Sequence, residues 1–159
     1  MSVLAATSAV VDSSAGYKVM LVLHILAVVV GFAPAWLTPL LVRLTANGDT
    51  AAADGLETSI LRFSLPGIAV AGLLGFGLAG MSKFGGATEP LYKMSQPWLS
   101  SAILLWLILL AVIAFVARPA IKAFRGGDAK ARGMIMMSTG ITHLILVVML
   151  YLMIFKPGA

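Results

Sequence analysis

The sequence predicts an all-α fold, an integral membrane bundle of four antiparallel transmembrane helices. Of its 159 residues, 60% are hydrophobic and only 11% are charged, and the mean hydropathy is +1.03. A soluble domain keeps about a quarter of its residues charged because its surface faces water. Four apolar stretches, each about 17 to 24 residues long, can cross a hydrocarbon core of about 30 Å as helices. They are too long for the strands of a membrane barrel.

Basic residues or prolines bound the apolar stretches. The four predicted helices cover residues 18–44, 60–82, 97–123 and 131–156, approximately. Residues 1–16 contain no basic cluster and no lipidation motif, so we expect a short extracytoplasmic tail. Asn47-Gly48-Asp49 is typical of a turn, and a short interfacial helix is expected from Thr50. Short loops favour antiparallel packing of consecutive helices within one domain, residues 17–159.

Basic residues concentrate in the loops that join the first helix to the second and the third to the fourth. These loops hold seven Lys and Arg residues against four on the other side. Five of the seven lie between the third and fourth helices: Arg118, Lys122, Arg125, Lys130 and Arg132. Positive loops stay in the cytoplasm, so both termini are predicted to be extracytoplasmic in a plasma (inner) membrane protein. The net charge of +5 then reflects orientation in the lipid bilayer, and no nucleic-acid partner is expected.

Small residues recur at four-residue steps in the first two predicted helices. The rows are Ala27, Gly31 and Ala35 in the first helix, and Gly67, Ala71, Gly75 and Ala79 in the second. Such rows let helix backbones approach closely in a membrane and gain dispersion contact. We expect them to form the seam between the two helices. The alternative is a groove against which a flat cofactor or lipid lies.

Both histidines of the chain, His24 and His143, lie within apolar stretches. An ionisable side chain at membrane depth indicates a functional site, so both are candidate cofactor ligands. The structural alternative is a neutral imidazole that is hydrogen-bonded to a nearby carbonyl or hydroxyl. Counted from Lys18 and Lys156, His24 lies about 9 Å deep and His143 about 20 Å deep. This difference disfavours one haem clamped between the two histidines.

The sequence contains one candidate metal site, which would bind copper. Met20 lies one helical turn before His24, and thioether with imidazole suits Cu(I). Methionine is also an ordinary filler of irregular cores, so the pair is a weak copper candidate. The chain has no cysteine, which excludes disulfides and thiolate metal sites. The apolar stretches contain no Asp or Glu, which argues against a carboxylate proton relay.

Short motifs in all four predicted helices follow an order found in a known group of proteins. They are Leu23-His24-Ile25 with Pro39-Leu40-Leu41-Val42, then Leu61-Arg62-Phe63-Ser64-Leu65-Pro66, Trp98-Leu99 and Phe155-Lys156-Pro157. In this order they resemble small four-helix integral membrane proteins related to the HemJ-type protoporphyrinogen oxidase and to the copper-resistance D (CopD) group. The resemblance covers all four predicted helices.

The resemblance implies a b-type haem with His24 at the position of the family's helix 1 histidine. It also implies a lysine early in the third helix, where this chain has Ala102 and no lysine from Trp98 to Ala117. Ser138-Thr139-Gly140 stand where an Asn-Glu pair is expected. These departures argue against protoporphyrinogen oxidation and leave open a haem-binding relative with His24 as one ligand.

The sequence thus favours a polytopic membrane protein without enzymatic chemistry. We expect a self-assembling homo-oligomer or an accessory subunit of a larger membrane complex. One alternative is a redox membrane protein that binds b-type haem through His24. A further alternative is copper handling through His24 and methionines.

Overall fold

The computed structural model describes residues 15–83 and 90–158. The expected N-terminal tail lies outside these ranges except for its last two residues. The described residues form helices α2 (Ala15–Ala46), α3 (Thr50–Thr58), α4 (Leu65–Met81), α5 (Pro97–Ala111), α6 (Arg118–Arg125) and α7 (Ala131–Phe155), with π-helical segments η1 (Ser59–Ser64) and η2 (Val112–Ala117). No strand occurs within the described ranges.

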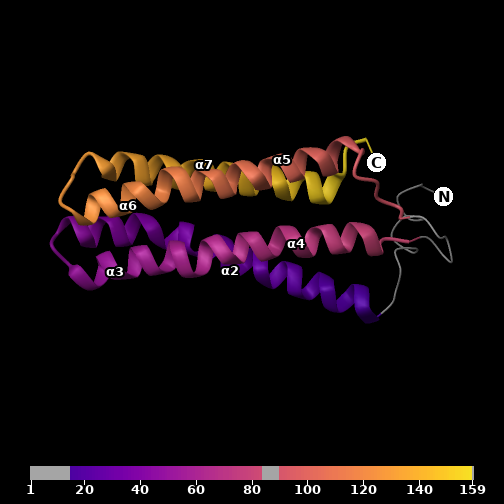
Figure 1. The fold of residues 1–159 in the computed structure, drawn as a ribbon, viewed down its shortest axis with the longest axis horizontal. Coiled ribbons are helices and arrows are strands. Elements are labelled where there is room, and N and C mark those ends of the chain that lie inside the picture. The colour runs from indigo at the N-terminus through magenta and orange to yellow at the C-terminus, as the bar shows by residue number, and fades with distance from the viewer. Residues whose placement is uncertain (1–14, 84–89, 159) are drawn as a thin grey trace.

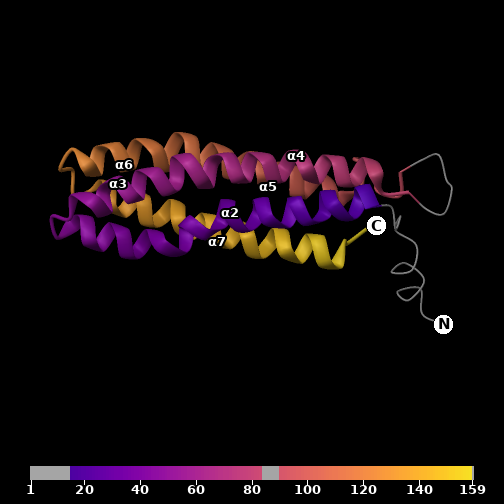
Figure 2. The ribbon, with the colours of Figure 1, turned by 90° about the horizontal axis from the view of Figure 1, so that it is seen from below.

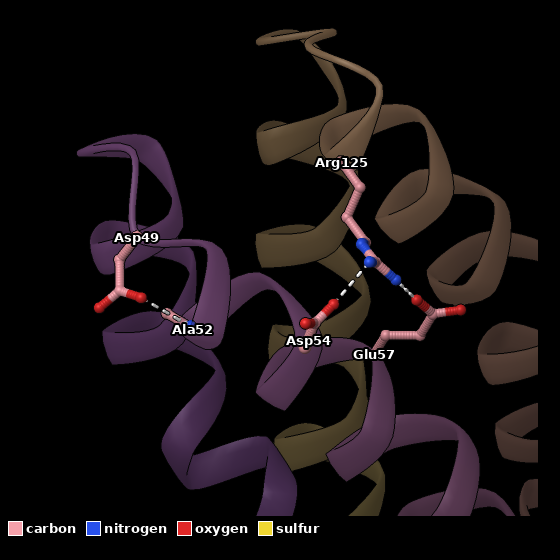
Figure 3. A network of polar contacts seen from close by, with 5 residues as sticks. All are labelled: Asp49, Ala52, Asp54, Glu57 and Arg125. Carbon is pink, nitrogen blue, oxygen red and sulfur yellow. Dashed lines mark hydrogen bonds and ion pairs between the residues drawn. The ribbon is translucent and has the colours of Figure 1, made fainter.

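These elements join into four long helices. The segments α3, η1 and α4 follow one another without a break, as do α5, η2 and α6, so the second helix spans Thr50–Met81 and the third Pro97–Arg125. All four helices are long and apolar enough to cross a membrane, which confirms the predicted all-helical class. The helix expected from Thr50 is therefore the first part of the second helix rather than a separate element. Its start is capped by Asp49, whose side chain accepts a hydrogen bond from the Ala52 amide at 3.0 Å (Figure 3).

The four helices lie side by side along one long axis (Figures 1 and 2). One end holds the short connections at residues 47–49 and 126–130; we call it the basic end, after Arg43, Arg125 and their neighbours. The other end holds the start of α2 and the end of α7 (Figure 1); we call it the tyrosine end, after Tyr17, Tyr92 and Tyr151.

Both π-helical segments end just before a proline. The Leu65 amide bonds to the Ile60 carbonyl, and the Arg118 amide bonds to the Ile113 carbonyl, each five residues back. Pro66 and Pro119 come next. A proline ring collides with the carbonyl four residues earlier, and the wider π turn moves that carbonyl away. The two long helices therefore continue through their prolines instead of ending there.

A close backbone approach joins α2 to α4 at Gly31 and Gly67. A β-carbon on Gly67 would lie 2.7 Å from the Gly31 nitrogen and 2.8 Å from its α-carbon. The Ser64 hydroxyl donates to the Gly31 carbonyl at 2.5 Å, which ties the two backbones together at the same level. Glycine is required on both sides because any side chain would push the helices apart.

Buried side chains join α2 and the second long helix to the third long helix and α7. Toward the basic end the core includes Val42, Leu56, Ile121 and Ile135, each at most 1% exposed. At this end Arg125 of α6 also forms ion pairs with Asp54 and Glu57 across to the second helix (Figure 3). Many large apolar side chains point outward along the rest of the bundle, with Trp36 68% and Phe115 79% exposed.

Candidate functional site

A cavity of about 470 Å³ lies between α2, α4, α5 and α7 and reaches the tyrosine end. Its volume falls within the range of about 300–1,000 Å³ typical of small-molecule sites. Most of its wall is aliphatic. The side chains with polar atoms on the wall are Tyr17, His24, Tyr92, Trp106 and Lys156. An apolar cavity with few, separated polar groups is typical of a site for a largely apolar ligand.

The small-residue rows of the first two helices divide between two roles. Ala27, Gly31 and Gly67 lie at the helix crossing, where the Ala27 carbonyl is 3.3 Å from the place of a Gly67 β-carbon. Ala71, Gly75 and Ala79 line the cavity instead, and Ala35 is buried. The small residues therefore form part of the seam between the two helices and part of the wall of a groove, which are the two interpretations that the sequence left open.

The imidazole of His24 is fixed on this wall. Its Nδ1 lies 2.8 Å from the Ala71 carbonyl oxygen. A carbonyl can only accept, so Nδ1 carries the hydrogen in this contact, and in the neutral tautomer with that arrangement the lone pair lies on Nε2. Nε2 has no hydrogen-bond partner among the described residues. A β-carbon at Gly75 would lie 3.4 Å from the His24 Cε1, so the ring rests directly against the α4 backbone.

Trp106 of α5 forms a second aromatic part of the wall. Its Nε1 donates to the Ile68 carbonyl at 2.8 Å, and its ring meets Phe76 edge-on with centroids 5.7 Å apart. The indole occupies the space left by Gly72, where a β-carbon would lie 2.1 Å from the Trp106 Cε2. Gly72 therefore allows α5 to lay a flat ring on α4. On α7, Met149 and Met153 complete the wall.

Met20 does not line the cavity, although it precedes His24 by one turn. Its sulfur packs on α4 at Gly77, 2.6 Å from the place of a β-carbon there. Among the described residues, no group of three His, Cys, Asp or Glu side chains could hold a metal ion. Copper ligation by Met20 would require this sulfur to leave its packing position.

His143 also lies apart from the cavity. Its ring meets Trp36 of α2 edge-on with centroids 4.4 Å apart, and its Nε2 is buried without a hydrogen-bond partner. Trp36 follows His24 by twelve residues, or about 18 Å along the helix, so the two imidazoles occupy different levels. The hydroxyls of Thr139 and Thr142 donate to carbonyls of their own helix and leave His143 unsatisfied.

The mouth of the cavity contains Tyr92 and Lys156, neither of which was a candidate site residue in the sequence analysis. Lys156 donates to the Tyr92 hydroxyl at 2.5 Å, and both side chains line the cavity. They are 64 residues apart in the chain. Only the packing of the residue that follows α7 against the segment that precedes α5 brings them together, and no local sequence signal encodes that contact.

Comparison with known proteins gives no match: the chain matches no family model, no curated protein and no solved structure.

Proposed function

We propose that this chain is a multi-pass membrane protein whose four antiparallel helices bind one large apolar ligand in the cavity between them. The observation that carries the proposal is the imidazole of His24. It is held by the Ala71 carbonyl on the wall of an apolar cavity, and its Nε2 has no hydrogen-bond partner among the described residues. In its neutral form, an imidazole anchored through Nδ1 can act through Nε2 as a ligand to iron or as a hydrogen-bond acceptor.

Membrane insertion is supported by the surface of the bundle. Large apolar side chains such as Leu73, Leu104 and Val147 are about three-fifths exposed, which would be costly in water and is favourable in lipid. Arg and Lys side chains gather at the basic end. We therefore place the basic end in the cytoplasm and the tyrosine end, with both termini, on the extracytoplasmic side of the plasma membrane.

A b-type haem is the ligand that we propose for this site. A haem would need a side chain that can ligate its iron and a dry, apolar pocket. His24 meets the first requirement through Nε2, and Met149 and Met153 place thioethers on the α7 wall. When bound, a haem would supply one-electron redox chemistry. The relation to the HemJ-type and CopD proteins remains a prediction from the sequence motifs.

Self-assembly or an accessory role in a larger complex is compatible with ligand binding but has less support. The small-residue rows that suggested helix association are occupied within the chain, at the α2–α4 crossing and on the cavity wall. A partner surface must therefore use other residues. Copper handling has the least support because the Met20 sulfur is packed against Gly77.

The test is a dithionite-reduced minus oxidised absorption spectrum of detergent-purified protein from haem-supplemented cells. Two matched variants are needed, His24→Ala inside the cavity and His143→Ala outside it. We expect a b-type spectrum in the wild type and in His143→Ala, and its loss in His24→Ala. A featureless spectrum of well-folded wild type, or equal spectra in both variants, would exclude haem ligation by His24.

A further inference from the structure

The C-terminal end of α7 directs one lysine to the mouth of the cavity. α7 ends at Phe155, and Lys156 follows with φ of 43°, in the left-handed region. Among the described residues it is the only non-glycine residue with positive φ. L-residues rarely adopt this conformation because the β-carbon approaches the following carbonyl oxygen. A lysine in this position is a local departure from the usual helix end, where glycine or asparagine is preferred.

The ammonium group of Lys156 is held by aromatic side chains. Its Nζ donates to the Tyr92 hydroxyl at 2.5 Å and lies 4.4 Å from the centroid of the same ring. The Trp98 ring centroid is 5.9 Å away. Tyr92 and Trp98 meet edge-on with centroids 5.2 Å apart, and the Trp98 Nε1 donates to the Gln96 side chain at 3.2 Å. The positive charge thus has a defined place beside two fixed rings.

This charge has no acidic partner among the described residues. An ammonium has three hydrogens to donate, and the Tyr92 hydroxyl accepts one of them. That hydroxyl still has its own hydrogen to donate. Lys156 and Tyr92 both line the cavity, so a positive charge and hydrogen-bond donors lie at the mouth of an apolar space.

We propose that Lys156 and Tyr92 form a carboxylate-binding subsite, and that the ligand of the cavity is an apolar molecule carrying a carboxylate. This inference rests on the proposed ligand site and adds the chemistry of its outer end. The carboxylate lies at the tyrosine end, where it receives hydrogen bonds from the ammonium and the phenol. The apolar body extends inward past His24.

The shape of the cavity agrees with a ligand that has a head and a body. Along α2 its wall runs from Tyr17 to Phe32, a rise of about 22 Å at 1.5 Å per residue. The polar mouth and the deepest apolar residues are therefore far apart. A haem, with its propionates, and a long-chain fatty acid both combine a carboxylate with an apolar body, and the experiment separates them.

The experiment uses the full chain in nanodiscs of zwitterionic phospholipid, with two probes and the methyl ester of each. One probe is haem, compared with haem dimethyl ester by titration of the Soret absorption. The other is a fatty acid with a diazirine in its tail, compared with its methyl ester by the yield of cross-links to peptides of the cavity wall. Each pair is measured on the wild type, Lys156→Gln, Lys156→Arg and the control Lys18→Gln, which removes an exposed lysine at the same end that does not line the cavity.

At least one acid should bind about tenfold more tightly than its ester, or label in correspondingly higher yield, because charge-assisted hydrogen bonds are lost in the ester. Lys156→Gln should remove this preference, and Lys156→Arg and Lys18→Gln should keep it. A preference seen only with the fatty acid would support the subsite and assign it to a lipid carboxylate. Haem ligation by His24 is tested separately, by the difference spectrum of the wild type and His24→Ala. Equal binding of acid and ester for both probes, or a preference unchanged in Lys156→Gln, would overturn the subsite even where His24 ligates haem.

Discussion

The contact between Gly31 and Gly67 predicts a large effect of a single methyl group. In Gly67→Ala the new β-carbon would lie 2.7 Å from the Gly31 nitrogen, whereas ordinary contacts begin near 3.4 Å. The atoms that it meets are backbone and cannot rotate away, so α2 and α4 must separate by about 0.7 Å. A gap of about 0.5–1 Å forfeits a quarter to a half of the dispersion energy at the contact.

We expect Gly67→Ala to lower the free energy of unfolding by about 1–2 kcal/mol. Overpacking of this kind costs about 1–3 kcal/mol, and the better helix propensity of alanine offsets up to about 1 kcal/mol. The separation would also stretch the hydrogen bond from Ser64 to Gly31. The measurement is reversible unfolding in mixed micelles with increasing SDS, followed by circular dichroism.

Gly80→Ala is the matched control on the same helix. A β-carbon at Gly80 meets nothing within 4 Å, so this variant should be neutral or more stable by up to about 1 kcal/mol. If Gly67→Ala unfolds at the same SDS fraction as the wild type and Gly80→Ala, the close approach of α2 and α4 is refuted.

Three further predictions concern the cavity wall, the basic end and the orientation. Gly72→Ala would place a β-carbon 2.1 Å from the Trp106 indole, displace it from its carbonyl partner and shift the tryptophan emission; an unchanged spectrum would contradict this packing. Arg125→Gln should lower stability by at most about 1 kcal/mol, because its side chain is 38% exposed and surface ion pairs are weak. The stability lost in Arg125→Gln should be smaller still in high salt. A loss above about 2 kcal/mol would contradict the expectation that these exposed ion pairs are weak. An alkaline phosphatase reporter fused at Ala129 should be inactive in cells, and an active fusion would reverse the proposed topology.

Hydropathy and length were sufficient to predict the helical class and the four long apolar helices. Both follow from local composition, since a stretch such as residues 98–117 has few alternatives to a helix in lipid. The start of the second helix could not be placed in the same way. The segment from Thr50 to Thr58 is polar enough to suggest an interfacial element, and its continuity with α4 depends on the π turn before Pro66.

The candidate site was only partly predictable for a related reason. His24 stands out because an imidazole is rare in an apolar stretch. Its hydrogen bond to Ala71 and the contact of Trp106 with Gly72 depend on how the helices are rotated against one another. The pairing of Lys156 with Tyr92 depends on which helix ends meet. The sequence of an apolar helix says little about how the helix is rotated about its axis or which helix it packs against, because every face of such a helix is compatible with lipid.

The most direct test of the account is native mass spectrometry of the protein released gently from its own membrane, compared with Gly75→Leu. Gly75 lies against the His24 ring, 3.4 Å from Cε1 at the place of a β-carbon, so a leucine side chain there would fill the cavity beside the imidazole. We expect the wild type to carry one bound molecule of defined mass and folded Gly75→Leu to carry none. A wild type at its bare mass, or the same added mass on both proteins, would contradict a ligand site between the helices.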